Sequence, residues 1–66
     1  MGIKLREARE AKKMTQEELA LKSGISRQTI SAIENNIAKE TKIGTLMALA
    51  KALEMSVDSI FFQNIV

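Results

Sequence analysis

Four side chains on one short predicted helix have types and spacing suited to contacts with base edges. The helix spans about residues 27–35, and the face away from its apolar residues carries Arg27, Gln28, Ser31 and Ala32. In a major groove, arginine can donate twice to guanine, a glutamine amide can pair with adenine, and an alanine methyl can contact thymine. The plainer interpretation is an ordinary solvated helix face. We expect base contacts from these four residues.

The residues before this helix indicate how it would be held. Thr15 with Glu18 three residues later is a capping-box pattern, which predicts a helix over residues 16–23. Ser26 can cap the following helix. Gly24 lies where the first helix must stop and the chain must take a positive φ, which costs glycine little. Two helices joined so closely predict a helix-turn-helix unit.

Apolar residues at three- and four-residue spacing predict three further helices, which makes the chain an all-α, compact five-helix bundle. These helices are expected over residues 3–13, from 42 or 43 to 53, and over 56–62. Thr41 is the preferred cap of the fourth helix, although its register stays open. The expected core consists of Leu5, Ala8, Leu19, Ala20, Ile30, Ile33, Ile43, Leu46, Leu49, Ala50, Leu53, Val57, Ile60 and Phe61.

Arg9 is a charged residue on the inward stripe of the first helix, where Lys12 also falls. A buried guanidinium requires a carboxylate partner. Glu34, at the end of the third helix, is the best candidate and would tie the first helix to the third. The alternative is that Arg9 extends to solvent along its apolar stem. Lys13 stands where a helix-ending glycine would be more comfortable, so we expect a slightly strained or frayed helix end there.

Candidate phosphate contacts flank the same helix pair. Gln16 is a neutral side chain beside the free N–H groups of a helix start, which suits a phosphate, although it could also have no partner. Lys39 and Lys42 follow the third helix, whereas Glu54 and Asp58 lie near the other end. This placement could orient one face toward phosphate. A mixed, solubilising surface explains the charges equally well.

The composition bounds the remaining possibilities. The 66 residues suffice for one domain, residues 1–66, with a formal net charge of +2 and no cysteine, histidine or proline. We therefore expect no catalytic residues, no metal, no cofactor and no small-molecule ligand, and hence not an enzyme. No apolar run approaches the length of a membrane span and no signal peptide opens the chain, so we expect a soluble cytoplasmic protein.

The end of the chain is apolar where a polar tail would be ordinary. Phe62, Ile65 and Val66 either fold back over their own domain or meet a partner chain. A small protein with one DNA-reading helix usually needs a two-fold partner for useful affinity. We favour a homodimer whose interface includes these three residues.

Two segments give the chain a resemblance to a known family. They are LREAREAKKMTQEELALKSGISRQTISAIEN and TLMALAKALEMSVDSIF, which together cover most of residues 4–61. The order of TQEELA, SGISRQTIS and IEN, followed by AKAL, resembles the lambda-repressor-like, Cro/cI-type (XRE) helix-turn-helix family. The resemblance implies a five-helix bundle with its third helix in the major groove.

Several site residues follow from the resemblance. It implies that Gln16 and Asn35 contact phosphates, that Arg27 and Gln28 touch base edges, and that Arg9 and Glu34 form an ion pair. The chain departs from the family pattern at Lys13 and Asn36, where glycine is usual, and at Thr41, where proline is common. These departures concern the loop that holds Lys39 and Lys42.

The expected function is a sequence-specific DNA-binding transcriptional regulator, a repressor acting as a homodimer on double-stranded DNA. The alternative is a protein-interaction module, for instance an antitoxin whose main partner is another protein. The apolar tail, residues 62–66, is the feature that could serve that alternative.

Overall fold

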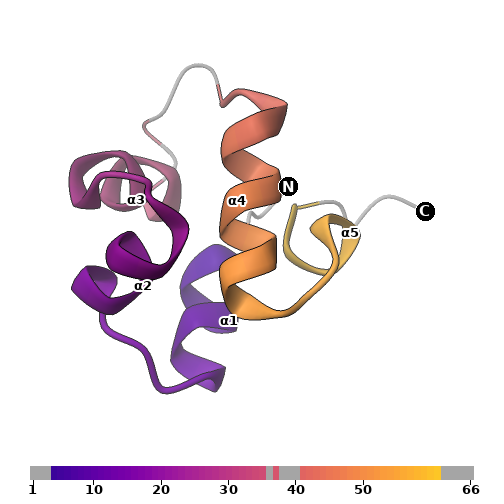
Figure 1. Ribbon diagram of the computed structural model, residues 1–66, viewed down its shortest axis with the longest axis horizontal. Coiled ribbons are helices and arrows are strands. Elements are labelled where there is room, and N and C mark those ends of the chain that lie inside the picture. Colours follow the sequence, from indigo (N-terminus) through magenta and orange to yellow (C-terminus); the bar gives the residue numbers. More distant parts are fainter. Residues whose placement is uncertain (1–3, 36, 38–40, 62–66) are drawn as a thin grey trace.

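Helix α4 lies in the middle of the view, with α2 and α3 on one side of it and α5 on the other (Figure 1). The computed structural model describes residues 4–35, 37 and 41–61, with only the backbone of Phe61. The helices are α1 (Leu5–Ala11), α2 (Gln16–Ser23), α3 (Arg27–Glu34), α4 (Ile43–Leu53) and α5 (Val57–Phe61). α4 packs against α2 and α5, while α3 packs against α2 and α1. The described residues contain no strand, so the predicted all-α class is confirmed.

One apolar core receives side chains from all five helices. Its buried members are Leu5, Ala8, Leu19, Ile30, Ile33, Leu46, Leu49, Ala50, Leu53 and Ile60. Ala20 and Val57 pack against this core but are only partly buried. In α1, α3 and α4 the buried members lie three or four residues apart, because that spacing places side chains on one face. The sequence therefore identified most of the core correctly.

Two expected inward residues are exposed. Ile43 is 64% exposed. Successive residues of a helix are about 100° apart, so Ile43 lies on nearly the same side of α4 as Met47, four residues later. Met47 is also exposed, and the buried stripe of α4 lies to one side of both residues. Lys12 is exposed because α1 ends at Ala11, so that Lys12 already belongs to the helix cap.

Local hydrogen bonds set the ends of α2. The Thr15 hydroxyl accepts the Glu18 N–H at 3.0 Å, and the Glu18 carboxylate accepts the Thr15 N–H at 2.8 Å, so the predicted capping box is present. At the other end Gly24 has φ +74° and donates its N–H to the carbonyl of Ala20 at 2.9 Å. The observed α2 has the predicted bounds because both of its ends are fixed by nearby residues.

The end of α1 agrees with the sequence prediction, whereas the cap of α4 does not. Lys13 has φ +57°, the left-handed conformation expected to be strained for a residue other than glycine. The prediction that Thr41 caps α4 is wrong: the cap position is Lys42, with φ −69° and ψ 146° and no side-chain hydrogen bond. The cap lies at Lys42 because α4 begins at Ile43, one residue later than a Thr41 cap requires.

Several predicted features lie outside the described residues. They are the αL role of Asn36, the position of Lys39, and the tail residues Phe62, Ile65 and Val66. The side chain of Phe61, expected in the core, is likewise not described. Among the helices that the structure describes, none has the length and apolar character needed to cross a membrane.

Candidate nucleic-acid interface

The outer face of α3 is available to a ligand. Ile30 and Ile33 are 0% and 1% exposed and anchor the helix in the core. Arg27 and Gln28 are exposed at its first turn. The remaining two predicted base-contact residues, Ser31 and Ala32, are half-buried. The burial of one face therefore leaves Arg27 and Gln28 turned outward, with Ser31 and Ala32 only partly accessible.

The start of α3 is fixed by its cap. The Ser26 hydroxyl accepts the Thr29 N–H at 3.2 Å and donates to the Thr29 hydroxyl at 2.8 Å. Just before it, the Ile25 N–H donates to the Ser23 hydroxyl at 3.1 Å. The bond from the Thr29 N–H satisfies a donor that a helix start leaves unpaired, and the bond from Ile25 fixes the turn before the cap. They place Arg27 at the first helical position, beside the free N–H groups of the helix start.

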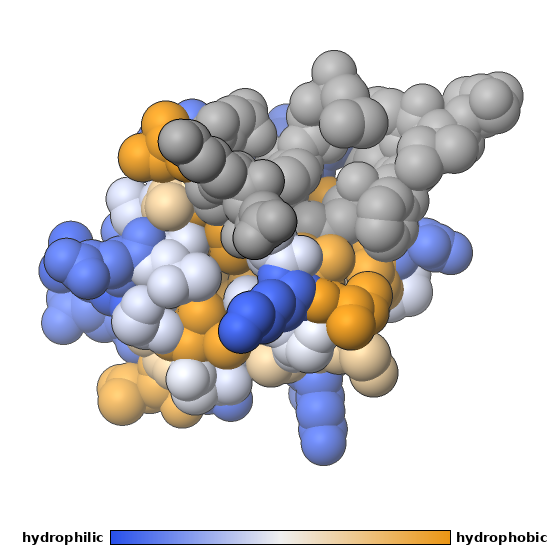
Figure 2. All heavy atoms as spheres, turned by 90° about the horizontal axis from the view of Figure 1, so that it is seen from above, coloured by the Kyte–Doolittle hydropathy of each residue, from blue (hydrophilic) through white to orange (hydrophobic). Residues whose placement is uncertain are grey.

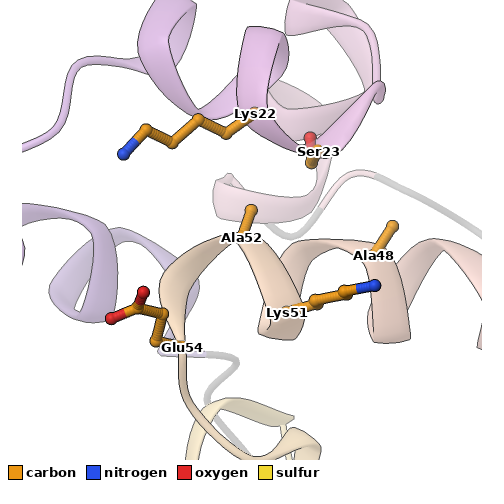
Figure 3. Close-up of a pocket in the computed structure, with 6 residues that line it drawn as sticks. All are labelled: Lys22, Ser23, Ala48, Lys51, Ala52 and Glu54. Atoms are coloured by element: carbon orange, nitrogen blue, oxygen red, sulfur yellow. The ribbon is translucent and has the colours of Figure 1, made fainter.

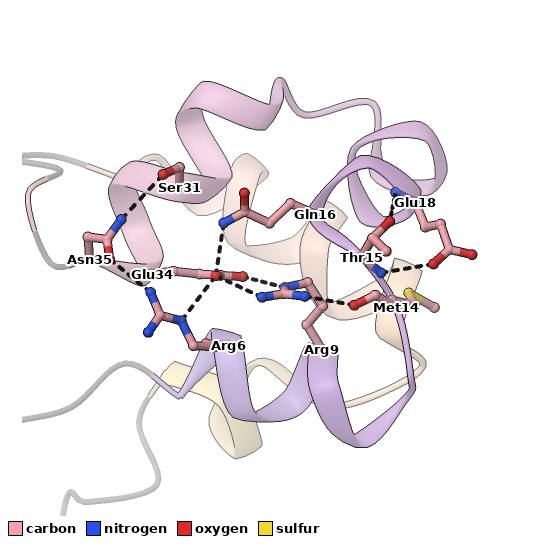
Figure 4. Close-up of polar contacts among 9 residues, drawn as sticks. All are labelled: Arg6, Arg9, Met14, Thr15, Gln16, Glu18, Ser31, Glu34 and Asn35. Carbon is pink, nitrogen blue, oxygen red and sulfur yellow. Dashed lines mark hydrogen bonds and ion pairs between the residues drawn. The ribbon is translucent and has the colours of Figure 1, made fainter.

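A buried carboxylate at the other end of α3 holds the helix to α1 (Figure 4). Glu34 accepts from Arg9 Nε at 2.7 Å and from Arg9 Nη2 at 3.1 Å. The Glu34 side chain is 0% exposed and that of Arg9 is 12% exposed. Arg9 Nη1 also donates to the carbonyl oxygen of Met14 at 2.7 Å, near the end of the α1–α2 connection. The ion pair expected between Arg9 and Glu34 is thus present, and it joins the first and third helices.

The charged state of this pair follows from its contacts. Burial raises the pKa of Glu34, but hydrogen bonds from Arg9 and Gln16 and the nearby charges outweigh burial, so its pKa lies below the ordinary value. The hydrogen bond to Glu34 raises the pKa of Arg9, against the opposing effect of burial. Both groups are therefore ionised at neutral pH.

Gln16 is drawn into the same cluster. Its Nε2 donates to Glu34 Oε1 at 3.1 Å, so the NH₂ end of the amide points toward Glu34 and its oxygen points away (Figure 4). A phosphate oxygen can only accept hydrogen bonds. A phosphate contact by Gln16 would thus use its backbone N–H or the second Nε2 hydrogen, which limits the role expected from the sequence.

Arg6 is the cluster member that the sequence reasoning missed. Its Nε lies 3.5 Å from Glu34 Oε1, and its Nη2 donates to Asn35 Oδ1 at 2.8 Å. The signal was available, since Arg6 precedes Arg9 by three residues and such residues share a helix face. Asn35 in turn donates from Nδ2 to the Ser31 hydroxyl at 3.3 Å. The cluster therefore extends from the buried carboxylate to the surface at the end of α3.

Two further surface features belong to α2 and α4. Lys42, an expected phosphate contact, is exposed at the start of α4. An open hollow of about 510 Å³ lies between the end of α2 and the second half of α4 (Figure 3). It is lined by Lys22, Ser23, Ala48, Lys51, Ala52 and Glu54. None of these residues belongs to α3, and the two lysines extend in different directions (Figure 3).

The described surface mixes polar and apolar side chains. Figure 2 shows apolar atoms in several groups separated by hydrophilic side chains on the face seen from above. The large apolar residues exposed in the described part of the chain are Leu21, Ile37, Ile43 and Met47. Within that same part, no three acidic side chains gather closely enough to hold a metal ion.

Comparison with known proteins agrees with this geometry. A family model described as helix-turn-helix matches residues 5–60. An uncharacterized HTH-type transcriptional regulator of Bacillus subtilis (strain 168), RghRB, is 42% identical over 59 residues, which are 89% of this chain and 42% of that protein. Another of Sinorhizobium fredii (strain NBRC 101917 / NGR234), y4dL, is 43% identical over 53 residues, which are 80% of this chain and 26% of that protein. The chain thus spans less than half the length of either relative.

Because the family model covers the whole bundle from α1 to α5, the chain belongs to the helix-turn-helix family of Cro/cI (XRE) type.

Proposed function

We propose that this chain is a sequence-specific DNA-binding transcriptional regulator that reads the major groove with α3. The observation that carries the proposal is the outer face of α3, where Arg27 and Gln28 are exposed while Ile30 and Ile33 are fully buried. A helix anchored in this way can enter a groove without unfolding its core. Its guanidinium and amide match the hydrogen-bonding edges of guanine and adenine.

Phosphate contacts would supply most of the affinity. We assign them to Gln16, Asn35, Lys39 and Lys42, and base contacts to Arg27, Gln28, Ser31 and Ala32. Lysine contacts release counterions from DNA, so binding should weaken as the salt concentration rises. Contacts to bases, in contrast, should distinguish one sequence from another.

Repression by a homodimer is the finer form of this proposal. A two-fold dimer would place two copies of α3 in successive major grooves, about 34 Å apart, and could block a promoter without any further domain. We place the dimer contact at Phe62, Ile65 and Val66. The regulator would act in the cytoplasm. Sedimentation of the pure protein tests it: an Ile65→Glu variant should sediment as a monomer and bind its DNA site more weakly, and a wild-type monomer on DNA would refute it.

Selection from random duplexes, followed by titration of the selected site, tests the main proposal. Arg27→Ala should weaken binding to the selected duplex by about 1–3 kcal/mol, or about 5- to 150-fold, and relax base preference at one position. Lys51→Ala is the matched control, because it removes one positive charge from the last turn of α4. An equal loss on selected and scrambled duplexes would show that Arg27 merely neutralises phosphate. A wild-type protein without any sequence preference would refute the reading role of α3.

An interaction module such as an antitoxin was the other candidate. Its distinguishing feature is the tail, residues 62–66, which lies outside the described residues. No feature of the described part of the chain favours that function over DNA binding, so we do not propose it.

A further inference from the structure

We propose that Arg6 is a positioning residue for DNA binding: it fixes the side-chain amide of Asn35 so that the NH₂ group faces the DNA side of α3. The inference deepens the proposed function and rests on it, since it assumes that Asn35 contacts a phosphate. It gives Arg6, a residue of α1, a part in DNA binding that the sequence analysis did not predict.

The chemistry of the two side chains makes the orientation obligatory. A guanidinium has five N–H donors and no acceptor, so the end of the amide that meets Arg6 must be the carbonyl oxygen. Arg6 Nη2 donates to Asn35 Oδ1 at 2.8 Å. The Nδ2 group then lies on the opposite side, where it donates one hydrogen to the Ser31 hydroxyl at 3.3 Å (Figure 4). Within the part of the chain that the structure describes, its second hydrogen has no acceptor and can be offered to a ligand.

This orientation matters because a phosphate oxygen only accepts hydrogen bonds. Asn35 is exposed, and water can solvate either end of a free amide about equally well. Without Arg6 the amide could therefore rotate and turn its carbonyl oxygen toward the phosphate, which repels it. Arg6 removes this alternative before the DNA arrives, so the cost of ordering Asn35 is already met in the free protein.

Arg6 is suited to this role by its own place in the cluster. Arg9 makes the two short bonds to Glu34, whereas Arg6 Nε lies 3.5 Å from that carboxylate. Glu34 thus draws the Arg6 guanidinium toward the end of α3 while leaving its Nη2 for Asn35. The positive charge also lies at the C-terminal end of α3, where the helix dipole favours it. The Arg6 side chain is 51% exposed, so this guanidinium can be altered without opening the core.

The first experiment observes the amide in the free protein. In a wild-type NMR spectrum, the side-chain NH₂ protons of Asn35 should show cross-relaxation with the β protons of Ser31. In Arg6→Met this cross-relaxation should weaken, while the backbone spectrum stays that of a folded protein. Lys12→Met serves as the control, because it removes an equal charge at the end of the same helix. Unchanged cross-relaxation in Arg6→Met would overturn the proposal.

The second experiment measures binding to the selected duplex over a range of salt concentrations. Arg6→Met should weaken binding about 3- to 10-fold, the effect of one neutral hydrogen bond, and should change the salt dependence no more than Lys12→Met does. In an Asn35→Ala background Arg6→Met should cause no further loss. Arg6→Lys should bind as weakly as Arg6→Met, because an ammonium is drawn to the carboxylate of Glu34 and lacks the guanidinium fork.

The outcomes separate this proposal from its rivals. If Arg6 touches phosphate itself, Arg6→Met should reduce the salt slope by about one relative to Lys12→Met, add to the loss from Asn35→Ala, and be rescued by Arg6→Lys. Any of these results would overturn the positioning role. If the wild-type protein bound all duplexes equally well, the proposed function would be refuted instead. The NMR measurement would still decide the orientation of the Asn35 amide.

Discussion

Removal of the Glu34 carboxylate should cost much of the stability of this domain. The side chain is 0% exposed, and Arg9, its main partner, is only 12% exposed. Glu34→Ala would leave the Arg9 guanidinium with little solvent and without its two bonds of 2.7 and 3.1 Å. Breaking a buried pair in this way typically costs about 3–5 kcal/mol. The free energy of unfolding of a 66-residue domain is about 3–10 kcal/mol. The loss should therefore remove a large part of it.

Urea denaturation followed by circular dichroism can measure this effect. Four variants are needed: Glu34→Ala, Arg9→Met, the double variant Arg9→Met with Glu34→Leu, and Glu17→Ala. The double variant should recover much of the stability, because it leaves no buried charge without a partner. Glu17 is exposed in the first turn of α2, so its replacement should change stability by less than about 0.5 kcal/mol.

Two results would refute the reasoning. If Glu34→Ala cost no more than Glu17→Ala, the carboxylate would be solvated in solution rather than buried. If the double variant were no more stable than either single variant, removing the second charge would bring no recovery, and Arg9 and Glu34 would not act as a pair. In either case the connection between α1 and α3 would have to rest on the apolar core alone.

Three further predictions follow from local geometry and charge. The pKa of Glu34 in the folded protein lies below its ordinary value of 4.5, so the unfolded chain takes up the proton first as the pH falls. The stabilisation by the Glu34 carboxylate is therefore complete well above pH 4.5 and is lost as the pH falls toward the lowered pKa. The difference in melting temperature between wild type and Glu34→Gln should accordingly be constant from neutral pH to about pH 5 and shrink as the pH falls further; a difference that did not shrink at acid pH would contradict this. Lys13→Gly should raise the free energy of unfolding by about 0.5–1 kcal/mol by relieving the positive φ of 57°; a destabilised variant in urea titration would argue against strain there. Thr15→Ala should lower that free energy by about 1 kcal/mol through loss of the capping bond to Glu18, with no effect expected if the cap frays in solution.

The ends of α2 and the turn after it were predictable because their causes are local. The capping box of Thr15 and Glu18 joins residues only three apart, and the positive φ of Gly24 belongs to a single residue. The core was also largely predictable, since a three- and four-residue period marks one side of a helix whatever that side packs against. The partner of Arg9 could be named as well, because a buried guanidinium demands a carboxylate.

The family assignment of the sequence was confirmed, whereas the base, phosphate and dimer contacts stay predictions. The pattern of TQEELA, SGISRQTIS and IEN identifies the fold because each segment meets a distinct local need: a cap, a turn and an anchored helix. The placement of Arg27 and Gln28 on the open side of α3 follows from the burial of Ile30 and Ile33. A duplex would still have to show which of these groups it meets.

The tertiary structure alone decided three features. It set the start of α4 at Ile43 with its cap position at Lys42, a register that the sequence pattern left open. It turned the amide of Gln16 inward to Glu34, 18 residues away. It brought Arg6 to Asn35, 29 residues away, and so fixed which end of that amide faces outward. Caps and periodicity act within one or two turns of the chain and can be read from sequence, but the direction of a polar side chain depends on partners that only the packed helices bring within reach.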